Sequence, residues 1–109
     1  MNYVKIAMIS DLMPGSKKKI VLETREIMLV NLDGSYYALD NKCPHMGGSL
    51  SDGTLSANVI TCPRHGASFD VKTGENKGDA KIAFIKMKVK DAKSLPVKVE
   101  GEDIFIGIE

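Results

Sequence analysis

The chain has 109 residues, of which 43% are hydrophobic and 27% are charged, with 15 basic residues against 14 acidic ones. This length predicts one domain that buries its own core without help from disulfides. A net charge of +1 argues against a nucleic-acid-binding protein, which usually carries a strongly basic face.

The first forty residues alternate between apolar and polar side chains with the period of β-strands. Strands are expected at residues 3–8, 19–24, 26–32 and 35–40. Pro14-Gly15 predicts a turn between the first two, and Asp33-Gly34 predicts a tight hairpin because both central positions of the favoured turn need positive φ. The basic run at residues 17–19 is expected to be a solvated loop.

Residues 41–78 have a different character, since six of the ten glycines and two of the four prolines lie there. Only short strands fit between them, at 58–61 and 67–71. Later strands are expected at 85–90, where the apolar spacing also fits a helix face, and in a hairpin at 95–100 and 104–108. The fold class is therefore all-β, an antiparallel sandwich or barrel with a smaller loop-built subdomain.

Two short motifs, Cys43-x-His45 and Cys62-x-x-His65, contain every cysteine and every histidine of the chain. A proline follows each cysteine and stiffens the loop, and a glycine lies within two residues of each histidine. Two thiolates and two imidazoles on two rigid loops predict a four-coordinate metal site. Their concentration into 23 residues argues against four separate core or surface residues.

Zinc and an iron–sulfur cluster are the two metal groups that suit this donor set. Zinc fingers usually place both cysteines on one knuckle and both histidines on another. Here each loop carries one cysteine and one histidine, which suits a two-metal cluster with both cysteines on one iron and both histidines on the other. Two histidines replace two cysteines in this way in Rieske [2Fe–2S] centres, so the spacing favours that cluster over zinc.

The chain resembles the Rieske-type [2Fe–2S] ferredoxins in the segments around these motifs, "NKCPHMGGSLSDG" and "VITCPRHGASFDVKTGE". It also resembles them in two further segments, "DGSYYAL" and "LPVKVEGEDIFIGIE". The resemblance implies one [2Fe–2S] cluster, with Cys43 and Cys62 on one iron. It places His45 and His65 on the other iron, through Nδ1, at an exposed tip. It also implies a single Rieske domain over residues 1–109, in which an antiparallel β-sandwich base (1–40 and 79–109) carries an inserted cluster-binding subdomain (41–78).

High-potential respiratory Rieske proteins differ from this chain beside the ligands. They carry a serine and a tyrosine whose hydroxyls donate to cluster sulfurs, where this chain has Ala67 and Phe69. They also carry a disulfide between the two loops, at positions that are Gly48 and Arg64 here. These differences favour a soluble, low-potential ferredoxin. The stretch 76–84 lacks the proline of the loop that often covers the cluster in such ferredoxins.

The resemblance implies a one-electron carrier that catalyses no reaction itself and shuttles electrons from a flavin-dependent reductase to a terminal oxygenase. A catalytic oxygenase is excluded, because it needs a further iron on two histidines and a carboxylate, and both histidines are already used. The small Rieske subunit of an assimilatory nitrite reductase is the second hypothesis. A zinc-stabilised interaction module without a redox role is the third.

We expect a partner to dock over the tip that carries the two histidines. Its expected surround is Pro44, Met46, Gly47, Pro63 and Arg64. No apolar run approaches the length that spans a bilayer, and the N-terminus lacks a signal-peptide pattern. The chain is therefore expected to be cytoplasmic, with neither a membrane nor a nucleic acid as partner, and the resemblance to small ferredoxins implies a monomer.

Overall fold

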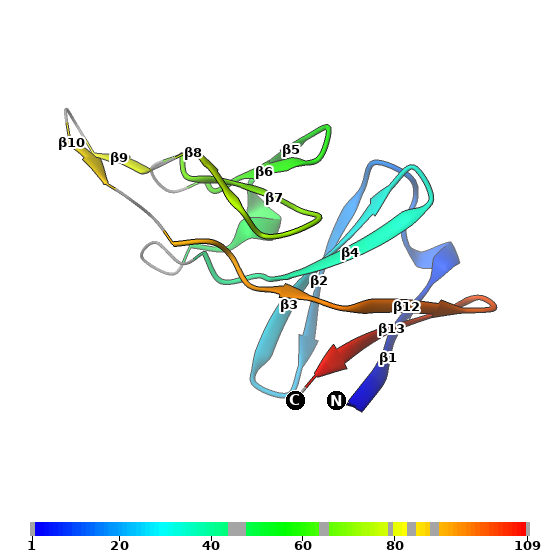
Figure 1. The fold of residues 1–109 in the computed structure, drawn as a ribbon. Coiled ribbons are helices and arrows are strands. Elements are labelled where there is room, and N and C mark those ends of the chain that lie inside the picture. Colours follow the sequence, from blue (N-terminus) through cyan, green and yellow to red (C-terminus); the bar gives the residue numbers. More distant parts are fainter. Residues whose placement is uncertain are drawn as a thin grey trace.

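A computed structural model describes residues 2–43, 48–63, 66–78, 80–82, 85–87 and 90–108 of the chain. Strands dominate these ranges (Figure 1). The strands are β1 (Asn2–Met8), β2 (Lys17–Leu22), β3 (Arg25–Leu32), β4 (Ser35–Asp40), β5 (Thr54–Ser56), β6 (Val59–Thr61), β7 (Ser68–Asp70), β8 (Asn76–Gly78), β9 (Ala80–Ile82), β10 (Ile85–Met87), β11 (Ser94–Leu95), β12 (Val97–Glu100) and β13 (Asp103–Ile108). Short 3₁₀ helices occur at η1 (Ile9–Asp11) and η2 (Leu50–Asp52). In the described part of the chain, no helix is long and apolar enough to cross a membrane.

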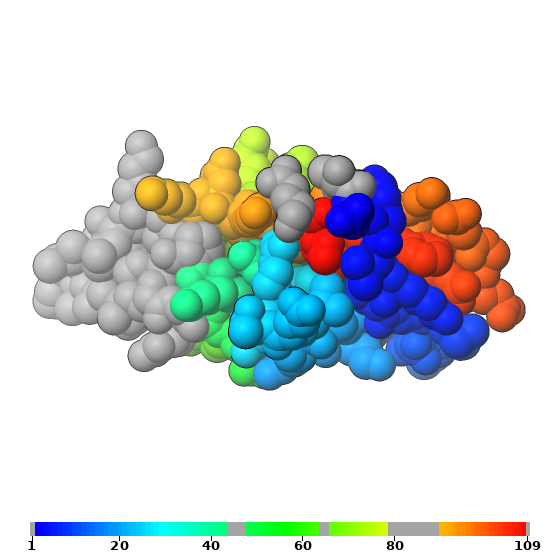
Figure 2. All heavy atoms as spheres, turned by 90° about the horizontal axis from the view of Figure 1, so that it is seen from below, coloured from blue at the N-terminus to red at the C-terminus, as the bar shows by residue number. Residues whose placement is uncertain are grey.

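The strands form antiparallel sheets, which confirms the predicted all-β class. A central sheet has the order β11-β4-β3-β2, an outer sheet has the order β1-β13-β12, and a third sheet has the order β5-β6-β7-β8. Strands β9 and β10 pair as a separate hairpin. Figure 1 shows the third sheet in green beside the central cyan sheet, with the outer sheet on the other side. In Figure 2 the N-terminal strand, in blue, lies against the C-terminal strands, in red and orange, at one end of the molecule.

Strand β3 joins the layers because it is buried on both faces. Ile27 and Leu29 pack into a core shared with the outer sheet. Met28 and Val30 alternate with them and pack on the opposite face, in a core shared with the third sheet. The continuous apolar run "IMLV" is typical of a strand that is covered on both sides.

The first hairpins show where local turn signals succeed and where they fail. Asp33 and Gly34 have φ of 58° and 92°, which confirms the predicted tight turn. The strand expected at 19–24 instead begins and ends two residues earlier, at Lys17 and Leu22. It ends there because Glu23 adopts φ of 57° and turns the chain toward β3, although glutamate carries no turn signal.

The lysine run is not the solvated loop that the sequence suggested. Lys17, Lys18 and Lys19 all lie on β2, which is an edge strand of the central sheet. Lysines are common on edge strands because their charge discourages pairing with other chains. Lys17 is also partly buried, and its ammonium donates a hydrogen bond of 2.7 Å to the carbonyl of Ser51.

The strand expected at 95–100 is divided by Pro96. Leu95 ends β11, which pairs with β4 in the central sheet, and Val97 begins β12, which pairs with β13 in the outer sheet. Proline cannot donate to a strand ladder, so this is a natural point for the chain to change sheets. The segment expected at 85–90 is the strand β10 over Ile85–Met87, and residues 88 and 89 lie outside the described ranges.

Candidate metal centre

The first candidate ligand loop, residues 43–48, is closed at its base like a β-hairpin. Lys42 and Ser49 form an antiparallel bridge directly before and after it. The amide of Cys43 donates a hydrogen bond of 2.6 Å to the carbonyl of Gly48, the last residue of the loop. The backbone therefore holds Cys43 at the base of the loop.

The second candidate ligand loop, residues 62–67, repeats this construction. Thr61 and Ser68 pair at the adjoining ends of β6 and β7. The amide of Cys62 donates a hydrogen bond of 2.7 Å to the carbonyl of Ala67, again from the first residue of the loop to the last. The two loops thus have equal length, begin with cysteine and close with the same bond.

Both cysteines lie in one apolar core. Cys43 is 2% exposed and Cys62 is 1% exposed. They belong to the same packed group of buried side chains, with Leu50, Ile60 and Phe69 among its other members. Neither cysteine forms a disulfide. Two thiols from separate loops in one water-poor layer fit the thiolate half of a Rieske donor set.

The strand that leaves the second loop presents only apolar side chains to this core. Ala67, Phe69 and Val71 are all fully buried, and Ser68 and Asp70 between them are only half-buried, as strand alternation requires. Positions 67 and 69 therefore face the layer that holds the cysteines and offer it no hydroxyl donor. This agrees with the sequence argument for a low potential.

The imidazole half of the predicted set, His45 and His65, lies outside the described residues, as does Arg64. Within the described ranges, no group of three or more Cys, His, Asp or Glu side chains is placed to hold a metal ion. Cys43 and Cys62 are the members of the predicted set that the structure does place. Gly48 and Pro63 are also described, the first buried and the second exposed.

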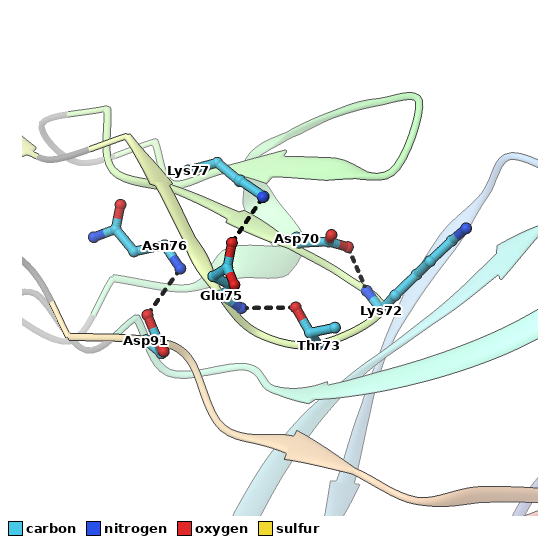
Figure 3. A network of polar contacts seen from close by, with 7 residues as sticks. All are labelled: Asp70, Lys72, Thr73, Glu75, Asn76, Lys77 and Asp91. Carbon is cyan, nitrogen blue, oxygen red and sulfur yellow. Dashed lines mark hydrogen bonds and ion pairs between the residues drawn. The ribbon is translucent and has the colours of Figure 1, made fainter.

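A hydrogen-bonded turn follows β7 and ends the strand that leaves the second loop (Figure 3). The carboxylate of Asp70 accepts from the amide of Lys72 at 2.9 Å, and the hydroxyl of Thr73 accepts from the amide of Glu75 at 3.1 Å. Gly74 at its centre has φ of 83°, and a Cβ there would lie 2.1 Å from a neighbouring carbonyl oxygen. Glycine is thus needed here because two backbone segments lie in close contact.

An ion pair lies beside this turn. The ammonium of Lys77 lies 2.8 Å from the carboxylate of Glu75, whose hydrogen bond and charge raise the pKa of Lys77 above its ordinary value (Figure 3). The carboxylate of Asp91 accepts from the amide of Asn76 at 2.9 Å and ties the turn to the chain before β11.

Comparisons with known proteins point to one family. A family model described as "Rieske [2Fe-2S] domain" matches residues 2–87. The ferredoxin component of the naphthalene 1,2-dioxygenase/salicylate 5-hydroxylase systems of a Ralstonia species is 33% identical over 108 residues, which is 99% of this chain and 97% of the relative. The ferredoxin of carbazole 1,9a-dioxygenase from Nocardioides aromaticivorans IC177 superposes over 100% of both chains, with a TM-score of 0.85 and 29% identity.

A second solved structure contains a ferredoxin together with another protein. It is described as a complex of reduced oxygenase and oxidised ferredoxin in carbazole 1,9a-dioxygenase. Its matching chain has a TM-score of 0.78 and 26% identity, and the match covers 95% of this chain and 91% of that one.

Proposed function

This chain belongs to the Rieske [2Fe–2S] family, and we propose that it carries single electrons from a flavin-dependent reductase to a terminal oxygenase. Its relatives are ferredoxin components, so the chain is an electron-transfer protein and carries one Rieske-type cluster. Our proposal concerns its partners, the reductase that donates the electron and the oxygenase that accepts it.

The proposal rests on the match between this chain and ferredoxin components, which extends over nearly the whole length of those relatives. The match covers 97% of the Ralstonia relative and 100% of the Nocardioides ferredoxin. Relatives matched over nearly their whole length that are themselves ferredoxins support the role of an electron carrier. The similar ferredoxin solved together with its oxygenase supports an oxygenase as the electron acceptor.

We assign Cys43 and Cys62 to one iron and His45 and His65 to the other. The cluster supplies the uptake and release of one electron. Two neutral imidazoles in place of two thiolates lower the negative charge of the centre and ease its reduction. The chain's own part is to hold the thiolates by backbone bonds at the loop bases and to keep water from them with an apolar core.

The cluster-binding unit is proposed to be residues 41–78, inserted in a single Rieske domain of residues 1–109. Both candidate ligand loops and the sheet β5–β8 fall in this stretch, which supports the division. We further propose that the protein works in the cytoplasm as a monomer. Cysteines outside any disulfide, kept as thiolate ligands, suit a reducing compartment.

Spectroscopy of the purified protein tests the ligand assignment first. We expect a red-brown protein with two irons per chain and, after reduction with dithionite, a rhombic EPR signal of the Rieske type. A colourless, EPR-silent protein that contains zinc would contradict the assignment and favour an interaction module.

Electron transfer to candidate partners tests the rest of the proposal. The protein is reduced, mixed without oxygen with an oxidised terminal oxygenase or with an assimilatory nitrite reductase, and followed by its visible absorbance. We expect rapid reoxidation by the oxygenase. Reoxidation by the nitrite reductase alone would contradict the proposed partner while leaving the cluster assignment intact.

A further inference from the structure

Asn41 is a buried polar residue that the ligand assignment leaves without a role. It lies two residues before Cys43 and is 0% exposed. A buried amide is costly unless its polar atoms are hydrogen-bonded. Its partners therefore show what the fold gains from keeping it.

The side chain of Asn41, on the entering flank of the first candidate ligand loop, bonds to the leaving flank and to strand β3. Its Nδ2 donates to the hydroxyl of Ser49 at 2.8 Å and to the carboxylate of Glu26 at 3.3 Å. Its Oδ1 accepts from the amide of Ser51 at 2.8 Å. One side chain thus joins the segment that enters the loop, the segment that leaves it, and strand β3.

Further hydrogen bonds extend this network to the edge of the central sheet. The hydroxyls of Ser49 and Ser51 lie 3.1 Å apart. The carbonyl of Ser51 accepts the bond from the ammonium of Lys17 on β2. The segment that leaves the first loop is therefore held from two sides.

The two candidate ligand loops need different support, although their bases look alike. The second loop ends a regular hairpin, in which β6 and β7 pair at three successive positions. Among the described residues, the base of the first loop has the isolated bridge between Lys42 and Ser49 as its only strand-type pairing. A single bridge resists fraying less than a ladder, so the first loop requires additional contacts to keep its ends together.

We propose that Asn41 is the positioning residue of the first ligand loop and that its side chain takes the place of the missing ladder. By fixing Ser49 and Ser51 against the strand end before Cys43, it sets how firmly Cys43 and His45 hold their irons. The inference rests on the proposed ligand assignment and needs no partner protein. The backbone bonds of Asn41, to the carbonyl of Glu26 and from the amide of Leu50, remain when the side chain changes.

Asn31 supplies a matched control because it is also buried, at 2% exposure, and uses its amide in the same way. Its Nδ2 donates to the carbonyl of Leu12 at 2.9 Å and its Oδ1 accepts from the amide of Gly34 at 2.8 Å. These bonds lie in the core next to the outer sheet and at the β3–β4 turn. Asn31→Asp therefore removes buried donors as Asn41→Asp does, but away from the cluster.

The experiment compares iron release to a chelator and the EPR line positions of the reduced cluster in wild type, Asn41→Asp and Asn31→Asp. We expect Asn41→Asp to release iron about tenfold faster than Asn31→Asp and to shift the EPR lines. Asn31→Asp should lower the thermal midpoint but keep the wild-type EPR lines. Equal release rates and unchanged lines in both variants would overturn the inference. A wild-type protein without a cluster would instead overturn the ligand assignment.

If Asn41→Asp does not fold, two less disruptive variants test the same inference. Ser49→Ala removes one acceptor of the Asn41 side chain, and Ser68→Ala changes the residue at the same position after the second loop. We expect Ser49→Ala to release iron several-fold faster than Ser68→Ala. Equal rates for these two variants would also overturn the inference.

Discussion

Hydroxyl groups introduced at Ala67 and Phe69 should raise the midpoint potential of the cluster. Both side chains are fully buried in the core that contains Cys43 and Cys62, and the carbonyl of Ala67 bonds to the amide of Cys62. A hydroxyl that donates to sulfur stabilises the reduced, more negative cluster more than the oxidised one. A preference of about 1.4 kcal/mol per donor corresponds to about 59 mV for one electron, so Ala67→Ser with Phe69→Tyr should give a rise on the order of 100 mV.

Val71→Thr is the matched control for this double variant. Val71 is the next inward-facing position on the same side, in the same core, and threonine has nearly its shape. A buried hydroxyl without a partner costs about 1–3 kcal/mol, so Val71→Thr should lower the thermal midpoint. Its reduction potential should stay at the wild-type value.

Protein-film voltammetry measures the potential, and iron analysis confirms that each variant carries its cluster. An unchanged potential in a fully loaded double variant would refute the reasoning, because the hydroxyls would then not act on the sulfurs. An equal rise in Val71→Thr would also refute it. The potential would then respond to the polarity of the core in general and not to donors beside the ligands.

Other perturbations separate further features of the fold and the docking tip. Gly74→Ala should lower the free energy of unfolding by about 3 kcal/mol, because φ is positive and the new Cβ would lie 2.1 Å from a backbone oxygen. Gly15→Ala has open space around the new Cβ and should lower it by about 1 kcal/mol. Comparable thermal midpoints for the two variants would contradict the close contact at Gly74. Lys17→Met removes a partly buried hydrogen bond and should lower the thermal midpoint by about 4 °C, while Lys18→Met on the exposed side of the same strand should leave it nearly unchanged. Arg64→Glu should slow electron transfer to the oxygenase in stopped-flow mixing without altering the visible spectrum, and an unaltered rate would remove Arg64 from the docking surface.

Local sequence signals located most strands but not every position at which the backbone takes positive φ. Asp33-Gly34 was recognisable because glycine and aspartate favour positive φ. Glu23 and Ala57 adopt φ of 57° and 53° without being such residues, so nothing in the sequence marked these two positions for positive φ. At these positions the pairing of the flanking strands compensates the local strain, and pairing is a non-local property.

The kind of metal centre could be predicted from the sequence, because it depends on which residue types occur together in two short motifs. Cys43, His45, Cys62 and His65 lie within 23 residues, and the mixture of one cysteine and one histidine in each loop favours a cluster over zinc. The absence of hydroxyls at Ala67 and Phe69 was equally readable, since it depends only on which residues follow the second histidine.

The tertiary structure alone decided how the first ligand loop is held. Asn41 meets Glu26 across 15 residues of sequence, and Lys17 meets Ser51 across 34. No local pattern marks such contacts, because they arise only when β2, β3 and η2 come together in the fold. The chemistry of the donors resides in the atoms of single residues, so it could be predicted from the sequence. How firmly the fold holds the loops that carry these donors depends on contacts between distant segments, which form only when the sheets pack.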